Sequence, residues 1–241
     1  MRTLVVGDIH GGLRALRQVL EKVHPTDGDR FIFLGDYVDG WSEVAETVSF
    51  LIEFSNKYAC TFIRGNHDYL LYQYLKHNDY NAMWLHHGGA SSIESYKRLS
   101  KSQKEDHLYF YETLRDYYVD DSNRLFVHAG FTNVHGIHHE HFKNMVFWDR
   151  TLWEVARSMD PSLTKDDIHY PQRLALYEEI YIGHTAVSKI GYTVPLNFAN
   201  LWNIDTGAAF NGPLTVFDVD TKEYWQSDPV YTLYPDEKGR N

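Results

Sequence analysis

Cysteine, basic residues and long apolar runs are what this 241-residue sequence has least of. The single cysteine, Cys60, excludes a disulfide framework and any zinc site built on cysteines. Lys and Arg number 23 against 33 Asp and Glu, and the net charge of -10 argues against nucleic acids and anionic membranes as partners. No run of about 18 apolar residues could span a membrane, and Met1-Arg2-Thr3 shows no secretory pattern. We therefore expect a cytoplasmic protein without a nucleic-acid or membrane partner.

Linker-like stretches are also lacking, which bears on the domain organisation. The sequence has no internal repeat, low-complexity tract or Pro/Ser-rich linker, and its length suits one large domain. Hydrophobic residues make up 43%, enough for a substantial core. We therefore predict a single domain over 1–241. Residues 133–178 lack clean strand patterns, and we expect them to form an excursion of loops and short helices over the site.

Five apolar runs of strand length each end on residues that can bind metal ions. The first three end at Gly7-Asp8-Ile9-His10, Gly35-Asp36 and Gly65-Asn66-His67-Asp68, and the last two end at His128 and His184. Helical apolar spacing over 13–23 and 44–54, between the first three runs, predicts a β-α-β-α-β start with parallel strands. Open α/β sheets bind ligands beyond the carboxyl ends of such strands. The sequence therefore predicts one site at which these five ends meet.

The residue types at these ends suit a pair of divalent cations. Asp8 and His10 are two apart, so on an extended strand end both would face the same side. A carboxylate with an imidazole favours Mn, Fe or Zn over Ca or Mg. Asp36, at the end of the neighbouring strand, is placed to bridge two ions. The second ion would take its neutral ligands from Asn66, His128 and His184. Two ions with few carboxylates keep positive charge for a phosphate and activate a bridging water as the nucleophile.

A spare histidine lies beside one predicted ligand. His67 follows Asn66 directly, so its side chain should project in a different direction. An imidazole at the edge of a metal pair is a candidate general acid for a leaving alkoxide. Asp39, three residues after Asp36, is the candidate partner that orients the ring of His67.

These motifs, in this order, resemble the calcineurin-like metallophosphoesterases. The chain is most similar to the bacterial and bacteriophage lambda-type branch of the serine/threonine phosphoprotein phosphatases. The resemblance extends to Trp84-Leu85, Trp148-Asp149-Arg150 and Asn203-Ile204-Asp205-Thr206-Gly207, so it covers nearly the whole chain. It implies an α/β four-layer fold, with a central β-sandwich of two mixed sheets flanked by α-helices. It also implies two divalent metal ions, with manganese as the ion of this branch.

The same resemblance assigns roles to individual residues. The ligands that it implies for one ion are Asp8, His10 and Asp36, and those for the other are Asp36, Asn66, His128 and His184. His67 is the implied acid and Asp39 its partner. The arginines that the resemblance places near the substrate phosphate are Arg64 and Arg150.

Two positions depart from the pattern of the family. The second motif normally ends Val-Asp-Arg-Gly, and its arginine grips the phosphate, whereas Asp39 is followed here by Gly40 and Trp41. A bidentate phosphate clamp is therefore missing from its usual place. Trp41 could stack on an aromatic or nucleotide group of the substrate, or could pack beneath the excursion at 133–178, and both hypotheses stay open. The third motif ends in Asp68 where the family has glutamate, at a position that is not a metal ligand.

Three functions compete at this point. The first is a phosphomonoester hydrolase of the serine/threonine phosphatase type, acting on phosphorylated proteins or small phosphoesters. The second is a nucleotide hydrolase like the symmetrical diadenosine tetraphosphate hydrolases of the family, which stacking by Trp41 would favour. The third is a non-catalytic module that binds phosphorylated partners, but binding alone needs no acid, so the retention of His67 argues against it. Activity on a phosphopeptide, a dinucleoside polyphosphate and a nitrophenyl ester would discriminate the three.

Overall fold

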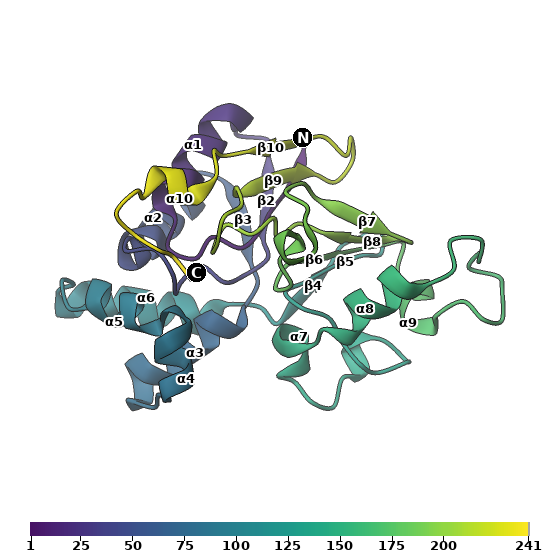
Figure 1. Cartoon of the computed structure of the whole chain (residues 1–241), viewed down its shortest axis with the longest axis horizontal. Coiled ribbons are helices and arrows are strands. Elements are labelled where there is room, and N and C mark those ends of the chain that lie inside the picture. The colour runs from purple at the N-terminus through teal and green to yellow at the C-terminus, as the bar shows by residue number, and fades with distance from the viewer. Residues whose placement is uncertain (241) are drawn as a thin grey trace.

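Two five-stranded sheets lie face to face at the centre of the molecule, in a computed structural model that describes residues 1–240 (Figure 1). The first sheet has the strand order β10-β9-β1-β2-β3, with β10 at Tyr224–Gln226, β9 at Thr215–Asp218, β1 at Thr3–Val6, β2 at Arg30–Phe33 and β3 at Ala59–Phe62. The second has the order β4-β5-β6-β8-β7, with β4 at Tyr117–Val119, β5 at Arg124–Val127, β6 at Glu179–Ile182, β8 at Leu201–Asn203 and β7 at Leu196–Phe198.

Both sheets are mixed, with parallel strands at the centre. Strands β1, β2 and β3 run parallel, and β9 and β10 add antiparallel partners on the other side of β1. In the second sheet β5, β6 and β8 are parallel, and β4 and β7 are antiparallel edges. Of the parallel strands, β1, β2, β5 and β6 are buried from their second residue on, which explains why they read as continuous apolar runs rather than alternating ones.

Alternate residues of each strand face different layers. Val5 of β1 and Ile32 of β2 pack between the two sheets with Phe126 of β5 and Tyr181 of β6. Their neighbours in the strands, such as Leu4, point the other way and pack against the helices that cover the first sheet. The molecule therefore has four layers, in the order helices, first sheet, second sheet and helices. The predicted four-layer α/β fold with a central sandwich of two mixed sheets is confirmed.

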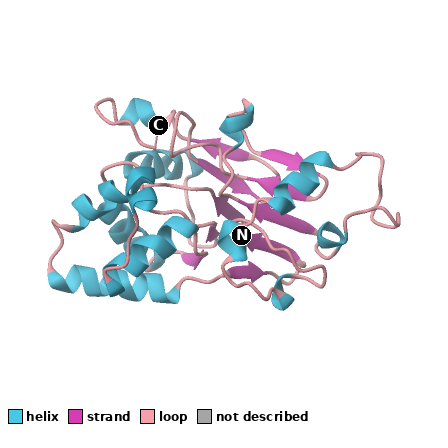
Figure 2. Cartoon of the chain, turned by 60° about the horizontal axis from the view of Figure 1, so that its bottom comes forward, coloured by secondary structure: helices cyan, strands magenta, loops and turns pink. Residues whose placement is uncertain are grey.

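The first sheet is covered by a group of helices that includes the longest ones, and Figure 2 shows most of the helices gathered on one side of the strands. These helices are α1 at Leu13–Val23, α2 at Val44–Ser55, α3 at Asn66–His77, α4 at Ala82–Trp84, α5 at Ala90–Tyr96, α6 at Lys101–Thr113 and α10 at Val230–Leu233, with a π-helical turn at Leu85–Gly89. The helix expected over 13–23 is confirmed by α1. Within residues 1–240, no helix combines the length and the apolarity needed to cross a membrane.

The segment 133–178 lies over the second sheet as loops and short helices. Its helical pieces are a 3-10 turn at Ile137–His139, α7 at Met145–Trp148, α8 at Thr151–Ser158 and α9 at Gln172–Ala175; a further 3-10 turn at Val187–Ile190 follows β6. Leu152 and Trp153 of α8 pack into the core of this sheet, next to Leu201. The single-domain organisation over 1–241 stays a prediction.

Candidate metal centre

The predicted ligands lie on loops that follow the strands rather than on the strands themselves. Strand β1 ends at Val6 and β2 at Phe33, before the ligands that follow them. His10, Asp36 and His184 all have left-handed backbone, with φ of 53°, 54° and 66°. This conformation is rare for residues other than glycine and collects at functional sites. The alternation of an extended strand is therefore the wrong reason for the pairing of Asp8 with His10, although both residues do reach one site.

Two groups of possible metal ligands share Asp36. Asp8, His10 and Asp36 form one group, Asp36, His128 and His184 form the other, and the ligand atoms of each group lie within 4.8 Å of one another. Asp36 Oδ2 is 3.6 Å from His10 Nε2 and 3.4 Å from His128 Nε2.

Asn66 completes this arrangement from the first turn of α3. Its Oδ1 lies 3.2 Å from His128 Nε2, and its side chain is buried. All six predicted ligands thus converge at one place, drawn from both sheets and from the start of α3.

The histidines are oriented as metal ligands are. His10 Nδ1 donates to the carbonyl of Asp39 at 2.8 Å, and His128 Nδ1 donates to the carbonyl of Leu34 at 2.8 Å. Each ring therefore presents Nε2 to the cluster, the tautomer that a hydrogen bond on the other nitrogen selects in metal sites. Nε2 of His184 is buried and has no hydrogen-bond partner among residues 1–240. A buried polar atom without a partner is rare, and a metal ion would satisfy it.

The charges of the cluster also fit cations. Burial, with the nearby charges of Asp205 and Asp36, raises the pKa of Asp8 well above its usual range. Burial lowers the pKa of His10 to about 3 and lowers that of His184 as well, so both rings are neutral and able to bind metal at pH 7. Buried carboxylates beside these two neutral imidazoles form a site that can bind cations. Two divalent ions would neutralise the carboxylates.

His67 and Asp39 form the pair that the sequence predicts. His67 Nδ1 lies 2.7 Å from Asp39 Oδ2, and Asp39 is completely buried. The same carboxylate accepts hydrogen bonds from Trp84 Nε1 at 2.6 Å and from the hydroxyl of Ser92. With these donors holding it, Asp39 fixes the orientation of the His67 ring, and the other ring nitrogen is left for a substrate.

Asp68, at a position set aside as a non-ligand, ties the loops of the site together. Its carboxylate accepts from the backbone amides of Asp36 at 2.7 Å, Tyr37 at 2.9 Å and Gly65 at 2.8 Å. The loop after β2 is therefore attached to the start of α3. Asp36 in turn accepts from the amide of His67 at 2.9 Å.

A cavity of about 380 Å³ opens over the ligands. Arg150 lines it and donates to Thr185 Oγ1 at 3.1 Å, and its expected contact with a substrate phosphate stays a prediction. Trp148, 42% exposed, also lines the cavity, and its ring lies 6.3 Å from that of His184. Arg64 is elsewhere: its guanidinium donates to the carbonyl of Leu114 at 3.1 Å and does not line the cavity. The lining of this cavity therefore gives no support to a substrate contact by Arg64, which stays a prediction.

Trp41 is not a substrate-stacking residue in this structure either. It is completely buried, its Nε1 donates to the carbonyl of Ala208 at 2.8 Å, and its ring stacks on Tyr234 at 5.1 Å. Both hypotheses drawn from the sequence fail, because Trp41 packs against the segment after α10 rather than against a substrate or the excursion at 133–178.

Four further residues line the cavity that the sequence did not indicate as functional; they are Asp205, Lys189, Phe210 and Arg240. Asp205 follows β8 by two residues, so the rule of polar residues after strands could have found it. Burial raises its pKa to about 6. No sequence pattern around Arg240 indicates a functional role, because it lies in a part of the chain without a motif.

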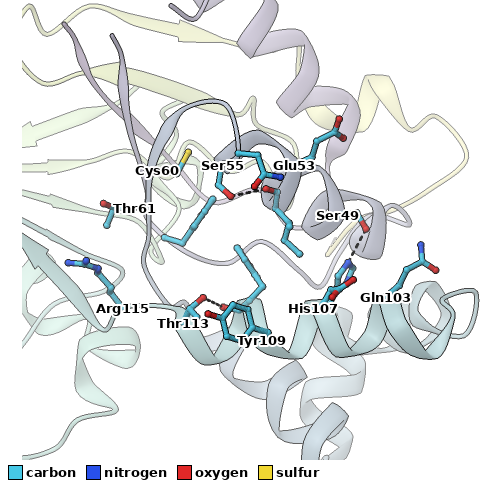
Figure 3. A pocket seen from close by; sticks show the side chains of 15 residues that line it. Ser49, Glu53, Ser55, Cys60, Thr61, Gln103, His107, Tyr109, Thr113 and Arg115 are labelled. Atoms are coloured by element: carbon cyan, nitrogen blue, oxygen red, sulfur yellow. Dashed lines mark hydrogen bonds between the residues drawn. The ribbon is translucent and has the colours of Figure 1, made fainter. Parts of the chain in front are cut away.

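A second and larger hollow, of about 660 Å³, lies between α2, β3 and α6 (Figure 3). His107 points into it, but both ring nitrogens are engaged, by Ser49 Oγ and by Tyr96 OH, each at 2.9 Å. None of the residues in the two groups of possible metal ligands lines it. The chemistry of the described residues is concentrated in the smaller cavity.

Comparisons with known proteins find a matching family and related sequences. The family model for Calcineurin-like phosphoesterase matches residues 1–207. A protein of Geobacillus thermodenitrificans named bis(5'-nucleosyl)-tetraphosphatase PrpE (asymmetrical) is 27% identical over 232 residues, which are 88% of this chain and 87% of that protein.

Solved structures share the fold. One described as a candidate diadenosine tetraphosphatase has a TM-score of 0.64 at 17% identity, over 93% of this chain and 92% of the other. A serine/threonine phosphatase from Saccharomyces cerevisiae has a TM-score of 0.59 at 16% identity, over 95% and 83%. Identities this low carry the fold alone.

Proposed function

The chain belongs to the calcineurin-like phosphoesterase family, and from this premise we propose that it is a metal-dependent hydrolase of bis(5'-nucleosyl) tetraphosphates. The observation that carries the proposal is the position of Asp36 between two groups of possible ligands, which suits a pair of ions sharing one carboxylate. The substrate class is taken from the name of the relative. The serine/threonine phosphatase expected first from the sequence is not confirmed, and its alternative is better supported.

The relative differs in one respect from the symmetrical diadenosine tetraphosphate hydrolases that the sequence suggested as the alternative. It is named asymmetrical, whereas the sequence analysis pointed to the symmetrical type. In the asymmetrical reaction water adds to a phosphorus near one end, a P–O–P bond breaks, and diadenosine tetraphosphate yields ATP and AMP. We adopt this cleavage for the proposal.

We assign the residues of the site separate roles in metal binding, proton donation and substrate binding. The ions would be held by Asp8, His10, Asp36, Asn66, His128 and His184, with manganese proposed as the metal. When bound, such a pair lowers the pKa of water and neutralises charge on the reacting phosphate. His67 is placed to give a proton to the leaving oxygen, with Asp39 fixing its ring. Arg150 and Trp148 offer a cation and an exposed ring at the cavity for the polyphosphate and a base.

A phosphomonoesterase is a second candidate, and the His67–Asp39 pair is the observation that favours it. The alkoxide released from a phosphoserine is a strong base and needs a proton donor. A nucleotide leaving from a polyphosphate is a much weaker base and gains less from one. The cytoplasmic location and the absence of nucleic-acid or membrane partners stay predictions.

The test is hydrolysis by metal-free protein reloaded with Mn, Zn or Mg, on three substrates: diadenosine tetraphosphate, a phosphoserine peptide and nitrophenyl phosphate. We expect the Mn form to release ATP and AMP, with kcat/KM at least roughly tenfold above that for the peptide. Asp36→Asn should lower the bound-metal count and abolish turnover, because both ligand groups lose a member. A higher kcat/KM on the peptide would favour the second candidate, and unchanged activity of the variant would remove the proposed centre.

A further inference from the structure

Arg240 places in the cavity a guanidinium that has no hydrogen-bond or ion-pair partner among residues 1–240. It lines the cavity together with His10, Asp36 and His67. Its Nε is buried, and within residues 1–240 the guanidinium has neither a hydrogen-bond acceptor nor a carboxylate in ion-pair contact. Buried donors are nearly always hydrogen-bonded, and guanidinium is suited to planar anions such as phosphate. An unpartnered guanidinium in this position indicates an anionic ligand.

The segment that carries Arg240 is fixed in place by contacts at several points. Tyr234 stacks on the buried Trp41. Glu237 accepts from the amide of Ser42 at 2.9 Å and from its hydroxyl at 2.6 Å. The amide of Arg240 itself donates to the carbonyl of Ala209 at 2.9 Å. Trp41 thus helps to position the segment that carries Arg240, because its ring packs against Tyr234.

Gly40 leaves the room that Arg240 uses. A Cβ at Gly40 would lie 3.6 Å from Arg240 Cγ and only 2.9 Å from the carbonyl oxygen of His10, and Gly40 has φ of 142°. The stem of Arg240 therefore lies over the position at which the second motif lacks its arginine. A side chain at Gly40 would be strained by this φ and by its close approach to the carbonyl oxygen of His10, and its Cβ would touch the stem of Arg240. Restoring an arginine at that position is expected to harm the site rather than to improve it.

The balance of charge in the cavity favours an additional cation that can bind phosphate. Asp205 lines the same wall, so with Asp8 and Asp36 it offsets about three of the four charges that two divalent ions bring. Lys189 Nζ lies 3.8 Å from the centre of the Phe210 ring, and Arg240 Cζ lies 5.5 Å from the same centre. Phe210 therefore holds two cations at one side of the cavity.

We infer that Arg240 binds the phosphate of the substrate beside the candidate metal centre, in place of the arginine that is missing at Gly40. The inference rests on the proposed function only in requiring a phosphate ester or anhydride as the substrate. The ligand that this requires is a pair of phosphoryl oxygens, which accept hydrogen bonds from the two outer nitrogens of Arg240 or from one of them and Nε.

The test measures binding of inorganic phosphate to the Mn-loaded protein by titration calorimetry, without any turnover. Arg240→Met keeps the apolar stem and removes the charge, and we expect it to raise the Kd of phosphate by roughly tenfold or more, as the loss of a charge-assisted hydrogen bond predicts. Arg157→Met is the matched control, because Arg157 lies on α8 and pairs with Glu154 at 3.0 Å, away from the cavity. The control should bind phosphate as the unchanged protein does.

A third variant separates binding from packing. Arg240→Lys keeps a charge but not the planar fork, so it should recover part of the affinity that Arg240→Met loses, at an equal melting temperature. Unchanged phosphate affinity in Arg240→Met would overturn the inference. So would equal losses in the Lys and Met variants accompanied by the same fall in melting temperature, which would mark a packing role. Because phosphate is the probe, either result stands whether or not diadenosine tetraphosphate proves to be the substrate.

Discussion

Asp36 illustrates how much a single residue can do in this site. One carboxylate oxygen accepts the amide of His67 at 2.9 Å, and the other faces His10 and His128 at 3.6 and 3.4 Å. Burial disfavours the charged form, but the charges of His128 and His67 hold the pKa of Asp36 well below its usual range. The residue therefore enters the site as an ionised carboxylate, oriented by the start of α3.

At the same scale, His67 can be tested through the leaving group. His67→Asn should lower kcat by roughly 10²–10⁴ on a phosphoserine peptide, the range of a positioned general acid. The loss should be much smaller on nitrophenyl phosphate and on diadenosine tetraphosphate, whose leaving groups scarcely need a proton. Steady-state kinetics on the three substrates, with the metal content measured for each protein, checks this. Equal losses on all three would assign His67 to phosphate binding or to structure.

At the scale of elements, the site depends on how two loops and one helix are joined. The loop after β2 carries Asp36, and α3 begins with Asn66 and His67. Asp68 holds these pieces together through three backbone amides. Gly65 is needed at this junction, because a Cβ there would lie 2.1 Å from Asp36 Oδ1. The strands set the positions, and this junction sets the orientations.

Asp68→Ala should lower the free energy of unfolding of the metal-free protein by about 2–4 kcal/mol, because three buried amides lose their acceptor. Bound metal should also decrease, since Asp36 loses its support. Asp79→Ala is the control: Asp79 is exposed just after α3, and its replacement should change stability by less than about 0.5 kcal/mol. Urea unfolding and metal analysis of both variants check this. A stable Asp68→Ala protein with normal metal content would contradict the role.

At the scale of the whole molecule, an ion pair fastens the beginnings of two central strands. Asp29, 2% exposed just before β2, accepts from Arg2 Nη2 at 2.6 Å and Nε at 3.1 Å, and from the amide of Thr26 at 2.8 Å. The hydrogen bond from Arg2 holds the pKa of Asp29 well below its usual range. An acid whose pKa is lower in the folded state stabilises the fold above its unfolded pKa, near 4. That contribution is lost as the pH falls through the folded value.

Asp29→Asn should therefore lower the free energy of unfolding by about 1–2 kcal/mol between pH 5 and 8, since a charge-assisted pair is reduced to a neutral one. The difference from the unchanged protein should shrink as the pH falls below about 4. Urea unfolding across this range measures it, with Asp27→Asn, an exposed neighbour, as the control. A difference that does not depend on pH would show that geometry rather than charge is responsible.

The sequence by itself predicted a parallel α/β start and the residue types of the candidate site, and the resemblance to the family supplied the sandwich of two mixed sheets. Short apolar runs between helical patterns indicate parallel strands, of which β1 and β2 are buried, and the polar residues after such strands lie at one edge of the sheet. Asp8, His10, Asp36, Asn66, His128 and His184 were accordingly found as one set, and so was the pairing of His67 with Asp39. These conclusions depend on neighbours in sequence and on the general geometry of sheets.

The tertiary structure alone decided which other side chains reach the cavity. Trp41 and Arg64 lie close to motif residues in sequence, yet one stacks on Tyr234 and the other turns to Leu114. Arg240 lies beside Gly40, 200 positions earlier in the chain. Contacts between such distant residues depend on how the whole chain packs, and no local period or spacing encodes them. Packing also sets the left-handed backbone at His10 and Asp36, because only surrounding contacts hold a non-glycine residue there.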